Sequence, residues 1–104
     1  DTVYIVEGST LTGSSTASLG SNADQVIIDG IIHKLKINNG SDNSKDMIKI
    51  SNSENIKTKL TISHFGEEDR LILGDSVFLY SDIETQAAKK ELKELGIVIG
   101  LLDK

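Results

Sequence analysis

The residues of this sequence that could do chemistry are mainly carboxylates, and their grouping favours a hard cation. One acidic group follows Gly66 and another lies in an Asn/Ser-rich stretch, and together they comprise Glu67, Glu68, Asp69, Asp42 and Asp46. Calcium takes oxygen ligands of this kind. The second group has side-chain oxygens at alternate positions, as calcium loops do, but lacks the glycine and the distal glutamate of an EF-hand. Calcium is therefore the candidate metal at both groups, and solvated turns are the alternative.

The two histidines are the other candidate ligands. His33 and His64 lie near strand-like runs that occupy corresponding positions in their repeat units. Stacking of those runs would bring the two imidazoles together as ligands for zinc or copper. Otherwise both lie at the surface. Cysteine is absent, which excludes disulfides, thiol catalysis and cysteine-based zinc sites.

No known catalytic pattern occurs in the sequence. It contains no nucleophile elbow, no phosphate loop and no carboxylate pair marked out by its context. We therefore expect a protein that is not an enzyme and that has no cofactor other than the candidate calcium. Asn39-Gly40-Ser41 matches the glycosylation sequon, although a plain turn explains it equally.

Composition restricts the fold and the partners. The 104 residues fit one domain, 1–104, and with 4% aromatics and no Pro or Trp the core must consist mainly of Ile, Leu and Val, which favours sheet. The net charge of −5, with scattered basic residues, argues against a nucleic-acid partner. The sequence has no apolar run long enough to cross a membrane.

An Asp followed by apolar residues at the second and fourth positions recurs along the chain. It occurs at Asp1, Asp24, Asp46 and Asp69, at steps of 22 or 23 residues. This period defines units at about 1–23, 24–45, 46–68 and 69–80, each reading as strand, turn, strand. Residues two apart point to one side of a strand, so the sequence predicts a shared core of Val26, Ile28, Ile48, Ile50, Leu71 and Leu73.

Two mainly β architectures fit these units. A repeat of this length favours a parallel β-solenoid or β-roll-like fold. The turns at 29–30 and 74–75 favour the alternative, an antiparallel hairpin sheet or sandwich. Stacked units would place Asp24, Asp46 and Asp69 about 4.8 Å apart, where a backbone N–H or a cation must offset the repulsion.

The two flanking segments differ in character. Residues 8–22 are rich in Gly, Ser and Thr, which predicts a flexible loop or weak edge strand, with a hydroxyl-lined binding surface as the alternative. Ser81 and Glu84 form a capping-box pattern that begins one C-terminal helix at about 82–95, and Gly96 ends it. The apolar tail at 97–102 predicts a last strand. Helix and tail are expected to cap one end of the strands.

The junction of the third and fourth units, Leu60 to Leu73, resembles the strand-rich segments that flank the calcium-binding repeats of secreted RTX-type bacterial proteins. It shares their order of strand, Phe-Gly turn, Asp and second strand. The glycine-rich calcium nonapeptide of that family does not occur in this sequence, so no family ligand carries over. The resemblance implies a secreted or cell-surface location.

From these observations we expect a non-catalytic structural, assembly or adhesion module of a bacterial extracellular or surface protein. The chain begins at Asp1 without Met, which favours a fragment of a larger protein. The alternative is a small ligand- or carbohydrate-binding β domain, whose candidate contacts are Tyr4, His33, His64, Phe78 and Tyr80. A protein or glycan surface partner is expected in either case.

Overall fold

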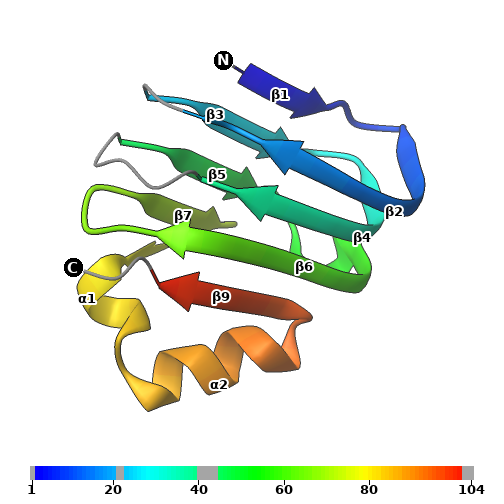
Figure 1. Cartoon of the computed structure of the whole chain (residues 1–104). Helices are drawn as coiled ribbons and strands as arrows, with labels where there is room; N and C mark the ends of the chain where they lie inside the picture. The colour runs from blue at the N-terminus through cyan, green and yellow to red at the C-terminus, as the bar shows by residue number, and fades with distance from the viewer. Residues whose placement is uncertain (1, 21–22, 40–44, 102–104) are drawn as a thin grey trace.

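The computed structural model describes residues 2–20, 23–39 and 45–101, which fold into two sheets with two α-helices (Figure 1). The architecture is mainly β, as the composition predicts. In chain order the elements are β1 (Thr2–Ile5), β2 (Thr10–Ser18), β3 (Gln25–Ile28), β4 (Ile31–Asn38), β5 (Met47–Ile50), the 3-10 helix η1 (Ser53–Asn55), β6 (Ile56–Phe65), β7 (Arg70–Leu73), β8 (Ser76–Leu79), α1 (Tyr80–Ile83), α2 (Gln86–Glu94) and β9 (Ile97–Leu101).

Successive strands alternate between the two sheets up to β7. One sheet has five strands in the order β1-β3-β5-β7-β8, and the other has four in the order β2-β4-β6-β9. All neighbours are parallel except β7 and β8. The Gly/Ser/Thr-rich segment contains β2, an edge strand of the four-stranded sheet, which agrees with the expected edge strand and not with the flexible loop.

The predicted parallel β-solenoid or β-roll-like fold is wrong. The fourth unit does not send its second strand into the other sheet, because Gly74 and Asp75 reverse the chain and β8 pairs antiparallel with β7. The five-stranded sheet is therefore mixed. The last place in the four-stranded sheet is taken by β9, which follows two helices instead of continuing a unit.

The alternative hairpin fold is also wrong at the turn that suggested it most strongly. β3 and β4 belong to different sheets, although only Asp29 and Gly30 separate them. Both of these residues donate their backbone N–H to the carbonyl of Ile5 at 2.9 Å. A Cβ on Gly30 would lie 2.4 Å from the carbonyl oxygen of Val6, so only glycine fits where the chain turns this corner.

The predicted shared core is confirmed. Its residues lie between the sheets, where Val26, Ile28, Ile48, Ile50 and Leu71 are completely buried and Leu73 is half-buried against them. Inward positions stay in register from strand to strand, since Val26 pairs with Ile48 and Ile48 with Leu71. The apolar pair that follows each repeated Asp therefore forms continuous rows through the core.

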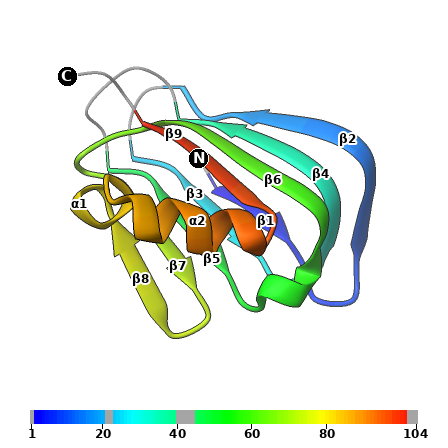
Figure 2. The same cartoon turned by 90° about the horizontal axis from the view of Figure 1, so that it is seen from below.

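The single helix expected at 82–95 is two helices. Thr85 interrupts it, because its Oγ1 accepts the backbone N–H of Ala88 at 3.2 Å and caps α2 as a separate element. Ile83 and Leu92 are buried, and Figures 1 and 2 show α2 beneath β9 at one end of the sheets. Neither helix of the described residues is long and apolar enough to cross a membrane.

Candidate functional site

The structure separates the carboxylates that were candidate calcium ligands. Asp46 and Asp69 are buried, at 2% and 4% exposure, whereas Glu67 and Glu68 are exposed in the turn before β7. Asp42 lies outside the described residues. Within the described residues no three His, Asp or Glu side chains come together as a metal site.

The buried aspartates instead form a hydrogen-bonded series, which we call the aspartate ladder: Asp24, Asp46 and Asp69. Asp46 Oδ1 accepts the backbone N–H of Asp24 at 3.0 Å, and Asp69 Oδ1 accepts that of Asp46 at 2.9 Å. Asp69 Oδ2 accepts the N–H of Gly66 at 2.7 Å. Backbone N–H groups therefore provide positive partners for the carboxylates of Asp46 and Asp69, and the bonds from Asp24 and Asp46 each join one strand start to the next.

The two histidines do not meet. Lys34 pairs with Lys59 and Asn38 with Ser63, so His33 and His64 lie at opposite ends of the β4–β6 pair, roughly 20 Å apart along the strands. The exposed His64 has a positive φ of 59°, and its Nδ1 lies 2.8 Å from Asn38 Oδ1. The zinc or copper pair that stacking of the two runs would have allowed is therefore not formed by these histidines.

The aromatic side chains do not form a common surface either. Tyr4 is exposed on β1, and its hydroxyl donates to Asp29 Oδ2 at 2.7 Å. This hydrogen bond and the negative charge of Asp29 raise the pKa of Tyr4. Phe78 and Tyr80 pack against the core at the opposite edge of the five-stranded sheet, roughly 19 Å from β1. A sugar-stacking site made of these residues is therefore not assembled.

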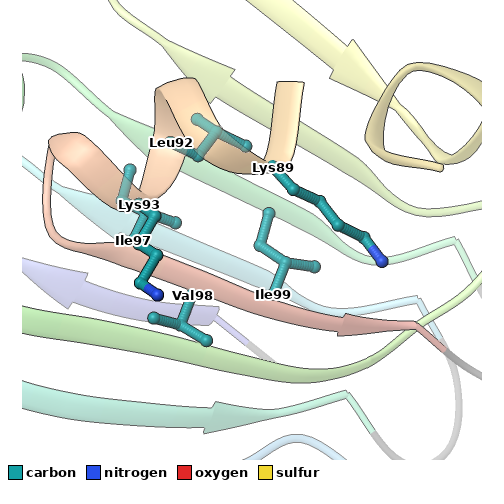
Figure 3. A pocket seen from close by; sticks show the side chains of 6 residues that line it. All are labelled: Lys89, Leu92, Lys93, Ile97, Val98 and Ile99. Atoms are coloured by element: carbon teal, nitrogen blue, oxygen red, sulfur yellow. The ribbon is translucent and has the colours of Figure 1, made fainter. Parts of the chain in front are cut away.

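A small pocket lies between α2 and β9 (Figure 3). Its volume is about 170 Å³, and its lining comprises Leu92, Ile97, Val98, Ile99, Lys89 and Lys93. Figure 3 shows both lysine side chains extending from the helix toward the strand. The lining consists of aliphatic groups and two amines, and no nucleophile has an acid or base beside it. We therefore interpret the pocket as part of the packing interface between α2 and β9.

The strongest candidate site is on the outer face of the four-stranded sheet. Lys34, Lys36 and Lys59 project there with three hydroxyl side chains, Ser14, Thr16 and Thr61, around a shallow hollow of about 240 Å³. We call these six residues the lysine face. Ser14, Lys34 and Lys59 form one row across three strands, and Thr16, Lys36 and Thr61 form the next.

Sequence reasoning missed this site because the basic residues are scattered along the chain. Lys34 and Lys59 are neighbours only through the pairing of β4 with β6. The available signal was a lysine beside an apolar residue in two strand-like runs, as in Lys34-Leu35-Lys36 and Lys59-Leu60, where both leucines are buried. The hydroxyl-lined surface suggested for residues 8–22 supplies Ser14 and Thr16.

Comparison with known proteins found no matching family model, no similar curated protein and no similar solved structure. The resemblance of residues 60–73 to segments of RTX-type proteins stays a prediction.

Proposed function

We propose that this chain is a non-catalytic assembly module of a bacterial extracellular or surface protein, in which the uncovered end of the two sheets receives another pair of strands. The main observation behind this proposal is that, within residues 2–20, 23–39 and 45–101, the first strands of the two sheets, β1 and β2, each have a neighbour on one side only. A strand with a free edge offers a row of N–H and C=O groups for pairing with a further chain segment.

The two ends of the core differ in a way that supports this proposal. At the end covered by α2 and β9, the core side chains Ile83, Leu92 and Ile97 are at most 1% exposed. At the other end, Val3 and Leu11 are only half-buried, although they pair with the buried residues Val26 and Ile32. Covering these side chains would stabilise the module by burial of apolar surface.

An extension of the chain tests the proposal. A second copy of residues 24–45, which carries β3 and β4, is placed directly before residue 1. We expect the added strands to pair with β1 and β2, which slows amide hydrogen exchange in both strands and raises the urea midpoint. The matched control carries the same extension with its copies of Val26 and Ile28 replaced by Lys. Equal exchange rates in β1 and β2 of the two proteins would rule the proposal out.

The extracellular location rests on the resemblance of residues 60–73. Its test is the intact gene product, where we expect an export signal. A short intracellular product without such a signal would contradict it.

The second candidate function, a ligand-binding β domain, is favoured by one observation, the lysine face.

A further inference from the structure

We propose that the lysine face binds an extended anionic polysaccharide, one whose carboxylate or sulfate groups recur along the chain. This inference deepens the second candidate function and does not rest on the assembly role. Ser14 and Thr16 stand on the edge strand β2, but the site lies on the outer face of the sheet, whereas assembly would use the backbone groups at the strand edge.

Charge is separated strongly in this molecule. The strands β2, β4, β6 and β9 contain no Asp or Glu, yet β4 and β6 carry four lysines: Lys34, Lys36, Lys57 and Lys59. Since the whole chain carries −5, the rest of it carries −9 (−5 minus +4). The four-stranded sheet is thus a positive surface on an acidic protein, and an anionic ligand would be directed to it.

No carboxylate of the part of the chain that the structure describes pairs with the lysines of the face. Among the described residues, the side chains of Lys34, Lys36 and Lys59 make no hydrogen bond or ion pair, and only their backbone groups are used in strand pairing. Lys34 and Lys59 are direct register partners, about 4.8 Å apart at the backbone, and like charges placed opposite each other destabilise a sheet. Anionic groups bound between these ammonium groups would relieve that repulsion.

The spacing and the neighbouring groups fit a polysaccharide. Lys36 lies two residues beyond Lys34 on the same strand face, about 6.6 Å along it, so the positive charges are spread in two directions. The hydroxyls of Ser14, Thr16 and Thr61 lie among them and can both donate and accept hydrogen bonds. A ligand with spaced anionic groups and many hydroxyls matches this set.

A nucleic acid matches it less well. Single strands bind proteins by stacking their bases on aromatic side chains, and Phe65, the one Phe, Tyr or Trp in the four strands of this sheet, is completely buried. A lipid surface would require exposed apolar groups that insert beside the lysines, and the one apolar side chain that lines the hollow, Leu35, is buried at 5% exposure.

The test measures binding of the folded chain to polygalacturonate, dextran sulfate and neutral dextran by isothermal titration at low and at physiological salt. The site variant carries Lys34→Ser, Lys36→Ser and Lys59→Ser. The control variant makes the same charge change on α2 with Lys89→Ser, Lys90→Ser and Lys93→Ser, whose lysines are exposed. A thermal melt of each protein verifies that it is folded.

We expect binding to either anionic polysaccharide, none to neutral dextran, and a loss of at least about tenfold in affinity for the site variant only. Added salt should weaken the binding. An equal loss in the control variant would overturn the proposal, because it would show attraction to net charge alone. Equal or tighter binding of oligothymidylate, polyglutamate or vesicles containing phosphatidylglycerol would also overturn it, in favour of a nucleic acid, an acidic protein or a membrane surface.

Discussion

Replacement of Asp46 should show which of two roles the aspartate ladder has: its carboxylates either accept hydrogen bonds from backbone N–H groups or bind a metal ion. Asp46 is 2% exposed, and its Oδ1 accepts the N–H of Asp24 at 3.0 Å. Asp46→Ala leaves that N–H without this acceptor, which costs about 1–3 kcal/mol of unfolding free energy. Asp46→Asn keeps an oxygen in the same place and removes one charge from stacked carboxylates that repel each other. We expect the asparagine variant to lie within about 1 kcal/mol of the parent.

Urea unfolding followed by circular dichroism measures both changes, provided that the slope of free energy against urea is the same in all variants. Asp75→Ala is the matched control, because Asp75 is an exposed turn residue whose loss should change stability by no more than about 0.5 kcal/mol. If asparagine proved as damaging as alanine, the negative charge rather than the acceptor would be what the site needs. The hydrogen-bond reasoning would then fail, and a bound cation would take its place.

Three further predictions follow from the same structure. Ile50 is completely buried, so Ile50→Asp should cost about 4 kcal/mol or more and Ile50→Val about 1 kcal/mol; a folded, cooperative Asp variant in urea unfolding would contradict the shared core. The pKa of Tyr4 is raised in the folded protein above the unfolded tyrosine value of 10.0. The hydrogen bond from Tyr4 to Asp29 therefore contributes its full stabilisation below pH 10.0, and this stabilisation is lost as the pH rises through the folded pKa. Asp29→Asn should therefore lower the Tyr4 pKa toward 10.0 in an ultraviolet titration, and an unchanged titration would show that Asp29 is not the cause. Millimolar calcium should shift the melting temperature by no more than about 2 °C relative to chelator, whereas a rise of about 5 °C or more would indicate a ligand site.

The buried rows were predictable because strand periodicity is local. A residue pair such as Val26 and Ile28 points to one side of its strand in any sheet, so the repeated Asp and its apolar pair identified the core without knowledge of topology. The same spacing predicted that the aspartates would stack and would need a compensating group. The hydrogen bonds of Asp46 and Asp69 supply it.

The topology was not predictable because similar turns act differently. Asp29-Gly30 and Gly74-Asp75 are both two-residue connections between apolar runs. The first turns the chain into the other sheet, where its amides bind the carbonyl of Ile5 in a neighbouring strand. The second closes a hairpin. Long-range contacts decide between these outcomes, and local sequence does not contain them.

The lysine face was hidden by a change of register. A step of 23 residues, as between Asp46 and Asp69, would align Lys34 with Lys57. The observed partner is Lys59, because Ile32 already pairs with Ile56, at a step of 24 (56 − 32), and the pairing shifts by one further residue before Lys34, to a step of 25 (59 − 34). Such an irregularity leaves no trace in the composition or in the spacing of the repeated aspartates.

The aspartate ladder and the lysine face meet the same electrostatic problem in different ways. Parallel pairing places like charges in neighbouring strands in both sheets, and in low dielectric such charges repel strongly. In the ladder, backbone N–H groups at the strand starts point at the carboxylates, so the protein itself supplies the compensation. On the lysine face, the backbone groups of β4 are already used in its pairing with β2 and β6. The ammonium groups of Lys34 and Lys59 are therefore left to solvent and to any anion that reaches them. This asymmetry is why we place the binding function on the lysines and a structural role on the aspartates.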